Sequence, residues 1–252
     1  MRRSSWLPVV VALATLACSN RAPSSDVASD EVVGGNVDEA RVATVSVSSP
    51  HGACSGALVT AGAPGLRGSV LTAAHCLRGG VPTEVVVGDD TTASYAFHFR
   101  VSAAVAHPKF DFTSPVSDYD FAVLTVEGID ASWPIHLLAT EAEDATLAVG
   151  DAVTLSGFGL TASGAANNTK RREATLAVDA VTEERITSSG PGRASCGGDS
   201  GSPLLVRRTL ADGTTREVQV GVHSFGTPAC SGEATAMRVA SAREWILGQL
   251  VR

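Results

Sequence analysis

Short runs of β-branched and other apolar residues, separated by glycine, proline and aspartate, recur along most of the chain. Runs of this length between turn-forming residues are typical of β-strands. We expect strands at residues 42–48, 55–60, 69–72, 84–87, 97–106, 121–126, 152–155, 174–181, 203–207, 218–222 and 235–239. One helix is expected at residues 241–250, where Trp245, Ile246 and Leu250 share a face. This succession indicates an all-β sandwich or barrel.

The composition supports a folded chain with a sizeable core. Its 252 residues are 44% hydrophobic and 18% charged and include 25 glycines, which excludes wholesale disorder. The formal net charge of −7 argues against a nucleic-acid surface, because such a surface needs a basic field. No apolar stretch approaches the roughly 18–20 residues that span a bilayer, so we expect no transmembrane helix.

The first 17 residues have the pattern of a secretory signal peptide, with two early arginines, a short apolar stretch and small residues at its end. The end of this segment and the next residue, Leu16-Ala17-Cys18, resemble the lipobox of bacterial lipoproteins, although that motif usually has Leu where Thr15 stands. We favour lipidation of Cys18 over ordinary signal cleavage nearby, which would leave a spare thiol. In either case the chain is exported, and export permits disulfides.

Residues 18–31 are polar and rich in serine, alanine and aspartate, as in a spacer or propeptide. The composition changes sharply at Val32, and residues 32–252 are long enough for one β-rich domain or two small barrels. The stretch 139–150 is the expected boundary between two halves.

Three segments carry residues that can do chemistry. They are Leu71-Thr72-Ala73-Ala74-His75-Cys76, Asp118-Tyr119-Asp120-Phe121-Ala122-Val123-Leu124 and Cys196-Gly197-Gly198-Asp199-Ser200-Gly201-Ser202-Pro203. A serine hydroxyl becomes nucleophilic when a histidine takes its proton, and a buried carboxylate fixes that histidine's tautomer. The segments supply one residue of each kind: His75, Asp120 and Ser200.

Together the three segments resemble the trypsin/chymotrypsin-like serine proteases, in that family's chain order of His, Asp and Ser. The resemblance covers essentially all of residues 32–252. It implies an endopeptidase that forms an acyl-enzyme, with backbone N–H groups of Gly198 and Ser200 as the oxyanion hole. It also implies two six-stranded antiparallel β-barrels, at about 32–138 and 139–240, followed by the helix at 241–250.

The five cysteines fit the same resemblance. It implies that Cys54 pairs with Cys76 and that Cys196 pairs with Cys230, which leaves Cys18 as the fifth. A zinc site is the alternative for four cysteines, but the chain has no Cys-x-x-Cys motif and export favours disulfides. We therefore expect no metal and no cofactor.

The sequence Val32-Val33-Gly34-Gly35 resembles the new N-terminus that zymogens of this family expose on cleavage. The resemblance implies that the freed α-amino group of Val32 pairs with Asp199 and orders the oxyanion loop. Family zymogens often carry Arg or Lys before this position, whereas Glu31 stands here. We therefore expect cleavage at Glu31–Val32 by an enzyme other than a trypsin-like activator.

The residues of the expected specificity pocket lack a carboxylate for a basic side chain. Ala194 stands where trypsin-type enzymes have Asp. His223 and Ser195 resemble the pocket of glutamyl endopeptidases, and an imidazole and a hydroxyl can bind a substrate carboxylate. The far wall of the pocket matches Ser224, Phe225 and Gly226. Glu31 favours a glutamate preference, with which the chain could process itself; a small apolar pocket with elastase-like or chymotrypsin-like selectivity is the alternative.

We expect protein or peptide substrates, a proteinaceous inhibitor and a monomeric enzyme. Contact with a membrane is expected only through a lipid on Cys18. Cleavage at Glu31–Val32 would then release the enzyme from the cell envelope, because residues 19–31 contain no cysteine that could tether the propeptide to the domain. A protease homologue that serves as a binding module is the rival, although such homologues usually lack a triad residue.

Overall fold

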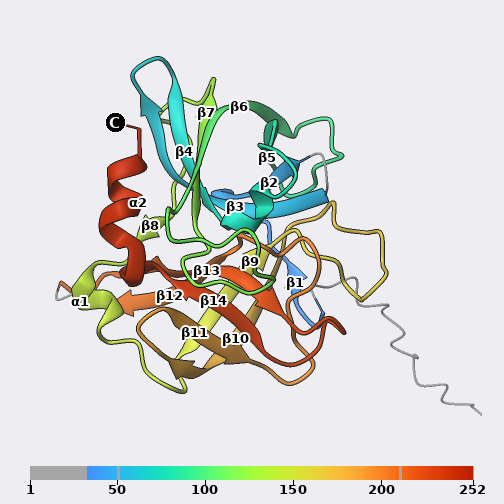
Figure 1. Cartoon of the computed structure of the whole chain (residues 1–252), viewed down its shortest axis with the longest axis vertical. Helices are drawn as coiled ribbons and strands as arrows, with labels where there is room; N and C mark the ends of the chain where they lie inside the picture. Colours follow the sequence, from blue (N-terminus) through green and yellow to red (C-terminus); the bar gives the residue numbers. More distant parts are fainter. Residues whose placement is uncertain (1–32, 50–51, 210–211, 252) are drawn as a thin grey trace, which may run out of the picture.

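The computed structural model describes residues 33–49, 52–209 and 212–251 as two β-barrels with a helix at the C-terminal end (Figure 1). The predicted all-β fold of two six-stranded antiparallel barrels is confirmed. The signal segment, Cys18, Glu31 and Val32 lie outside the described residues. None of the helices in the described part of the chain has the length and apolar character needed to cross a membrane.

The first barrel consists of six antiparallel strands. They are β2 (Thr44–Ser49), β3 (Gly52–Ala63), β4 (Arg67–Thr72), β5 (Glu84–Val87), β6 (Phe97–Ala106) and β7 (Ala122–Glu127). Their order around the closed barrel is β2-β3-β4-β7-β6-β5. The 3-10 helix η1 (Ala74–Leu77) follows β4 directly.

The second barrel also has six antiparallel strands. They are β9 (Ala152–Gly157), β10 (Arg172–Val181), β11 (Arg185–Ser189), β12 (Pro203–Thr209), β13 (Thr215–Gly226) and β14 (Ala234–Arg238). Pairing of β10 with β9 closes this barrel. Two short strands extend it: β1 (Asn36–Val37) pairs with β10, and β8 (Leu137–Leu138) runs parallel to β13.

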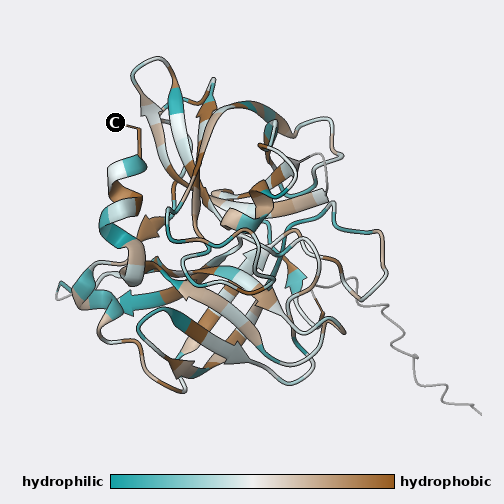
Figure 2. Cartoon of the chain, in the orientation of Figure 1, coloured by the Kyte–Doolittle hydropathy of each residue, from teal (hydrophilic) through white to brown (hydrophobic). Residues whose placement is uncertain are grey.

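Each barrel is filled by the inward side chains of its strands. Along β10, Ala174, Leu176 and Val178 are buried, whereas Thr175 and Ala177 between them are exposed. Figure 2 shows that hydrophobic and hydrophilic residues are mixed along the strands of both barrels. The period of two along β10 is the pattern of a sheet with one face in a core.

A shared apolar cluster joins the two halves. Helix α2 (Arg243–Gln249) contributes the fully buried Ile246, and 3-10 helix η2 (Val239–Ala242) contributes Val239. Both belong to the cluster of the first barrel, together with Met237 of β14 and Val222 of β13. The short helix α1 (Glu141–Asp144) starts with a capping box between Thr140 and Glu143. It occupies the expected boundary between the halves.

Both disulfides expected from the resemblance are present. Cys54 in β3 is bonded to Cys76 in η1, and Cys196 is bonded to Cys230. In the chain-entropy account, loops of 22 and 34 residues correspond to on the order of 3–4 kcal/mol of stabilisation each. The first bond fixes the histidine segment to β3, and the second fixes the serine segment to the loop after β13.

Candidate active site

The histidine and aspartate segments meet through direct hydrogen bonds. His75 lies on η1, and Asp120 directly precedes Phe121 and β7. The Nδ1 atom of His75 is 2.6 Å from Oδ2 of Asp120, and the backbone N–H of His75 donates to Oδ1 at 2.8 Å. A carboxylate at Nδ1 favours the tautomer with the proton there, which leaves Nε2 free to accept a proton.

Asp120 is held on three sides and is only 2% exposed. The hydroxyl of Ser224 donates to its Oδ2 at 2.5 Å. The preceding residue, Tyr119, has a φ of 58°, a conformation that is uncommon for a large side chain. Its ring stacks on His107 with centroids 4.8 Å apart, so His107 supports the aspartate segment rather than the chemistry.

The serine segment is fixed to both barrels. The carbonyl of Ser200 accepts the N–H of Ser55 at 2.7 Å, and the N–H of Gly201 donates to the carbonyl of His223 at 2.8 Å. Gly201 has a φ of 86°, and a Cβ atom there would lie 2.1 Å from Thr72 Oγ1. Only glycine fits this position, so β3, β4 and β13 together determine where Ser200 lies.

The turn before Ser200 is also held by hydrogen bonds of the Ser55 side chain, which sequence reasoning missed. The buried Ser55 hydroxyl donates to the carbonyl of Gly198 at 2.8 Å and accepts the N–H of Phe158 at 2.9 Å. Gly198 has a φ of 99°, and a Cβ atom there would lie 2.8 Å from the carbonyl oxygen of Phe158. The contacts of Ser55 have no local sequence signal, because they join residues more than 100 positions apart.

Asp199 is completely buried beside this turn. Its carboxylate accepts the N–H groups of Cys196 and Gly159, each at 2.9 Å. Burial raises the pKa of Asp199 to about 7, against the opposing effect of these two hydrogen bonds and the positive charge of Arg172. The ionised form of this buried carboxylate would be stabilised by a nearby positive charge.

The start of the described domain lies against the segment that leads to the serine. The carbonyl of Val33 accepts the N–H of Ala194 at 3.1 Å. Gly34 has a φ of 73° and packs so closely that a Cβ atom would lie 1.8 Å from the carbonyl oxygen of Gly192. The Nε atom of Arg193 donates to the carbonyl of Gly34 at 3.2 Å.

A cavity of about 330 Å³ adjoins Ser200. It is lined by Ser195, Cys196, Gly197, Ser200, His223, Ser224, Phe225, Gly226, Thr227, Pro228 and Cys230, with no acidic or basic side chain other than the histidine. The structure therefore brings five of the six expected pocket residues to one cavity. Ala194 is buried but is not among the lining residues.

His223 is the polar residue that distinguishes this cavity. It is 3% exposed, and burial, with a smaller contribution from nearby His75, lowers its pKa to about 3. The imidazole is therefore neutral at neutral pH and can donate one hydrogen bond. A side chain at Gly226 would meet Ser195 Oγ at 2.4 Å, so glycine keeps the space over Ser195 open.

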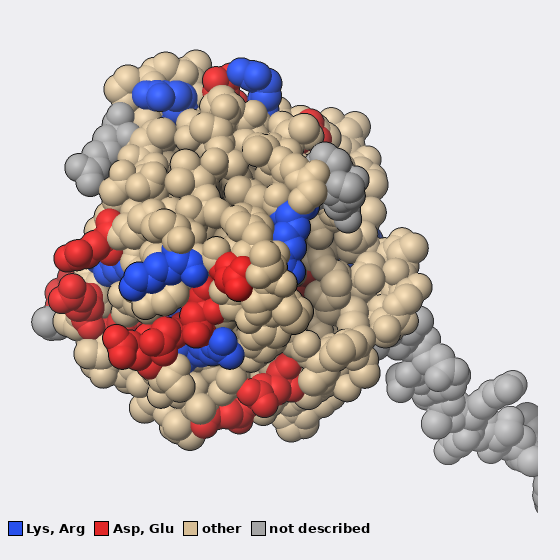
Figure 3. All heavy atoms as spheres, viewed as in Figure 1, with Lys and Arg blue, Asp and Glu red and all other residues tan. Residues whose placement is uncertain are grey.

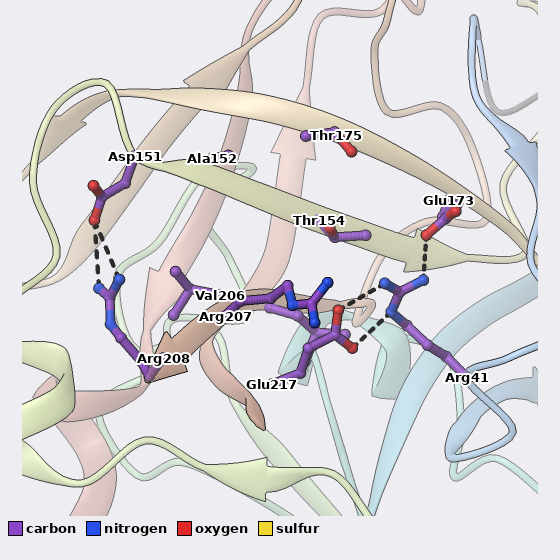
Figure 4. A pocket seen from close by; sticks show the side chains of 11 residues that line it. Arg41, Asp151, Ala152, Thr154, Glu173, Thr175, Val206, Arg207, Arg208 and Glu217 are labelled. Carbon is purple, nitrogen blue, oxygen red and sulfur yellow. Dashed lines mark hydrogen bonds and ion pairs between the residues drawn. The ribbon is translucent and has the colours of Figure 1, made fainter. Parts of the chain in front are cut away.

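Two other features of the described residues are a cluster with metal-ligand geometry and a second cavity. The one cluster with metal-ligand geometry is Cys54, His75 and Cys76, whose thiols are joined in a disulfide and cannot bind a metal as thiolates. A cavity of about 470 Å³ lies on the second barrel and contains no residue of the three motifs (Figure 4). Most of its charged residues are paired: Arg41 bridges Glu173 and Glu217, and Arg208 contacts Asp151.

With the fold and this geometry described, comparison with known proteins identifies the family. The sequence model of the family described as Trypsin matches residues 32–246. The chain belongs to the trypsin family. The match begins at the position where the composition changes and includes all three motifs.

Named relatives of this trypsin-family chain include proteases from insects and bacteria. Trypsin 5G1 of Aedes aegypti is 30% identical over 199 residues, which are 70% of this chain and 70% of that protein. Trypsin of Saccharopolyspora erythraea is 29% identical over 201 residues, which are 73% of this chain and 80% of that protein. Glucanase inhibitor protein 3 of Phytophthora infestans is 32% identical over 194 residues, 70% of this chain and 72% of that one.

Solved structures agree with the trypsin-family fold. Human heparin binding protein superimposes with a TM-score of 0.69 at 23% identity, covering 86% of this chain and 96% of that one. At this identity the likeness supports the fold alone.

Proposed function

We propose that this trypsin-family chain is an exported serine endopeptidase in which Ser200, His75 and Asp120 form the catalytic triad. The observation that carries the proposal is the pair of hydrogen bonds by which Asp120 holds the ring and backbone of His75, with Ser224 as a third partner. This arrangement presents the free Nε2 atom of His75 as a base. The fixed serine segment supplies the nucleophile.

In the proposed reaction, Ser200 Oγ attacks the carbonyl carbon of the scissile bond while His75 Nε2 takes the hydroxyl proton. Asp120 stabilises the resulting imidazolium, and the N–H groups of Gly198 and Ser200 bind the oxyanion. The imidazolium then donates its proton to the leaving amine, which yields the acyl-enzyme. A water activated by His75 hydrolyses that ester and regenerates Ser200.

The enzyme is made as a zymogen that is activated at Glu31–Val32. The docking of Val33 and Gly34 on residues 192–194 supports this proposal, since it places the start of the domain against the segment that carries Asp199. In the cleaved chain, the Val32 α-ammonium group pairs with the Asp199 carboxylate. That pairing relieves the cost of burying an isolated charge and orders the oxyanion loop.

The pocket is proposed to prefer glutamate before the scissile bond. Neutral His223 donates a hydrogen bond to the substrate carboxylate, Ser195 supplies a hydroxyl, and the negative charge raises the pKa of the imidazole on binding. The absence of any acidic side chain among the lining residues disfavours Arg or Lys. The competing proposal is a small-apolar or chymotrypsin-like preference, which the uncharged lining also suits.

Cys18 is proposed as the lipidation site of a bacterial envelope lipoprotein. The lipid holds the zymogen at the membrane, and cleavage at Glu31–Val32 releases the active protease. Its partners are protein or peptide substrates and a proteinaceous inhibitor.

A binding module without catalysis is the second candidate. Two similar proteins are named for inhibition of a glucanase and for heparin binding rather than for proteolysis. A serine-directed phosphonate that labels the cleaved chain but not the Ser200→Ala variant supports the protease. Absence of labelling in the correctly cleaved, folded chain supports the binding module.

The specificity proposal has its own test. A peptide library cleaved by the active chain should show Glu before the scissile bond, and His223→Val should shift the preference toward Leu, Ala or Phe. The matched control is Ser55→Ala, which lies outside the lining of the cavity and should lower turnover for all peptides without changing their ranking. A wild-type preference for Leu, Ala or Phe over Glu would refute the glutamate pocket.

A further inference from the structure

A cavity of about 210 Å³ contains the proposed catalytic histidine, and we call it the His75 cavity. Ser224 and Phe225 of β13 line both this cavity and the one beside Ser200. The two cavities therefore adjoin each other along that strand. The other lining residues of the His75 cavity come from the end of η1 and from the loop between β6 and β7; they are Arg78, Phe110, Pro115, Ser117 and Asp120.

Arg78 is fixed at this cavity by its backbone and by its side chain. It ends η1, and its backbone N–H donates to the carbonyl of His75 at 3.0 Å. Its Nη2 atom donates to the carbonyl of Ser114. Its guanidinium lies over the ring of Phe110, 5.5 Å from the ring centroid. The side chain is thus held between η1 and the loop that follows β6.

The positive charge of Arg78 has no ion-pair partner among the described residues. The Ser114 carbonyl and the Phe110 ring carry no net charge, and the Nε atom of Arg78 has no hydrogen-bond partner within the same residues. Asp111 in the same loop is not ion-paired with it, and its Oδ1 atom accepts the N–H and the hydroxyl of Thr113. A guanidinium forms its strongest hydrogen bonds with carboxylates.

Asp120, the one acidic residue of the lining, is already engaged. It is 2% exposed and accepts hydrogen bonds from His75 and Ser224. Its carboxylate therefore belongs to the proposed triad, and the guanidinium of Arg78 is left to a ligand from outside the chain.

A neighbouring residue of the substrate would face the His75 cavity. In the proposed reaction, the side chain before the scissile bond occupies the cavity beside Ser200. Consecutive residues of an extended peptide are about 3.3 Å apart, and their side chains project to opposite sides. The two neighbours at the proposed activation site are Asp30 before Glu31 and Val32 after it. A guanidinium matches the aspartate and not the valine.

We propose that Arg78 is a specificity-determining residue that binds an acidic side chain on the residue preceding the one in the cavity beside Ser200. The preferred cleavage site is then Asp-Glu or Glu-Glu, as in Asp30-Glu31. This inference rests on the proposed function and adds a second recognised residue to it.

Arg185 of β11 provides a matched control. Its guanidinium lies over the ring of Phe225, 5.6 Å from the ring centroid. Its Nε atom is 2.6 Å from Oδ1 of Asp118, and Arg185 lines neither cavity. It is therefore a nearby arginine whose charge is already paired.

The test uses peptides that differ only in the residue before Glu, which is Asp, Asn, Ala or Lys. The full chain is cleaved with an added glutamyl endopeptidase, which is then removed, and N-terminal sequencing verifies the product. Ser200→Ala treated in the same way gives the background rate. Active sites are counted with a serine-directed phosphonate, and kcat/KM is measured for the parent chain, Arg78→Gln, Arg78→Glu and Arg185→Gln.

The readout is the ratio of kcat/KM values between peptides, so a general loss of activity does not affect it. In the parent chain the Asp peptide should exceed the Asn peptide by about tenfold or more. Arg78→Gln should reduce this ratio to less than about threefold, and Arg78→Glu should make Lys preferred to Asp. Arg185→Gln should leave the ratio as it is in the parent chain.

The activation site of the chain gives a second readout. The uncleaved Ser200→Ala chain serves as a substrate for the active enzyme, with Asp30 or with Asp30→Asn. The aspartate form should be cleaved about tenfold faster by the parent enzyme, and at a similar rate to the asparagine form by Arg78→Gln.

The contrary results are distinct. Equal cleavage of the Asp and Asn peptides by the parent chain overturns the proposal, and so does a preference for Asp that survives in Arg78→Gln. A preference that Arg185→Gln abolishes equally overturns the assignment to Arg78. If another residue proves to be preferred in place of Glu, the same series built on that residue decides the role of Arg78. If no peptide is cleaved and the phosphonate does not react, the proposed function itself fails.

Discussion

At the scale of single residues, the described chain contains a natural pair of buried serines for comparison. Ser55 joins Gly198 to Phe158 through its hydroxyl, whereas Ser202 is equally buried but its Oγ atom has no hydrogen-bond partner within the described residues. A buried hydroxyl stabilises a protein only when it is hydrogen-bonded. The two serines should therefore respond in opposite ways to the same substitution.

Ser55→Ala should lower the free energy of unfolding by about 1–3 kcal/mol, because it leaves the partly buried Gly198 carbonyl and the buried Phe158 N–H without their partner. It should also reduce kcat, since the Gly198 carbonyl is then free to turn. Ser202→Ala should leave stability unchanged or raise it. Urea unfolding and steady-state kinetics on both variants measure these effects, and equal losses for the two would contradict the assignment.

The buried His136 gives the protein a defined sensitivity to acid. Its ring nitrogen Nε2 is 2.9 Å from Thr44 Oγ1, and burial lowers its pKa to about 4. Because the unfolded chain binds this proton near pH 6.5, the contribution of His136 to stability should fall by about 3 kcal/mol as the pH drops from about 6.5 to about 4. His223, with a pKa of about 3, acts in the same direction. Asp199, whose pKa is raised to about 7, acts in the opposite direction over the same range.

Urea midpoints measured between pH 7 and pH 4 test this prediction. The decline should be shallower in His136→Gln than in the parent chain, because glutamine does not titrate. A decline of the same steepness in both proteins would show that His136 does not control it. Ser200→Ala should be used as the background, so that self-digestion does not affect the midpoints.

At the scale of elements, sequence reasoning found the strands that carry local patterns and missed those defined by distant pairing. The strands β5 and β6 begin and end where predicted, at Glu84–Val87 and Phe97–Ala106. Strand β11 was not predicted, because Arg185–Ser189 contains one large apolar residue, Ile186. It becomes a strand by pairing with β10 and β14.

The extra length of β13 has the same cause and a functional consequence. The strand was expected at 218–222 but extends over Thr215–Gly226, with a register shift between His223 and Phe225. Such a bulge places consecutive side chains where regular alternation would not. Ser224, which lies in this bulge, donates to Asp120, and both Ser224 and His223 line the adjacent cavity. The motif residues were predictable from sequence, but the bulge depends on the pairing of β13 with β14.

The segment before β1 should be sensitive to a single methyl group. Gly34→Ala places a Cβ atom 1.8 Å from the Gly192 carbonyl oxygen, so the segment must leave residues 192–194. We expect activity of the cleaved chain to fall by about tenfold or more, because Val32 then no longer reaches Asp199. Phosphonate inactivation rates of the cleaved chains give the measurement.

Gly164→Ala is the matched control for backbone strain. Gly164 has a φ of 80°, close to that of Gly34, but a Cβ atom there would have no neighbour within 4 Å. It should cost about 1 kcal/mol of stability and leave activity unchanged. If the two variants lose activity equally, strain rather than docking explains the effect of Gly34→Ala.

At the scale of the whole molecule, the charged side chains on the second barrel argue against a surface that binds polyanions. Figure 3 shows acidic and basic side chains intermixed over the second barrel near α1, where Arg216 contacts Glu143 and Arg238 contacts Asp144. Paired charges of both signs do not create the single-sign field that a polyanion needs. This face of the molecule therefore lacks the field of a polyanion-binding surface.

The proposed release from the membrane concerns the whole chain and can be tested as one experiment. In a bacterial host that lipidates exported proteins, the uncleaved Val32→Pro chain should partition into the detergent phase of a Triton X-114 separation. The cleaved chain should partition into the aqueous phase, because cleavage after Glu31 separates Cys18 from the domain.

Cys18→Ser is the control, and this variant should be aqueous in both forms because it has no thiol to carry the lipid. Mass spectrometry of the N-terminal peptide then distinguishes a lipidated Cys18 from a free one. A lipid found on the active, phosphonate-reactive species would contradict release, and an aqueous Val32→Pro chain with an unmodified Cys18 would contradict anchoring. The experiment thus tests two proposals separately. Anchoring of the zymogen depends on the lipid at Cys18, whereas release depends on cleavage of the Glu31–Val32 bond.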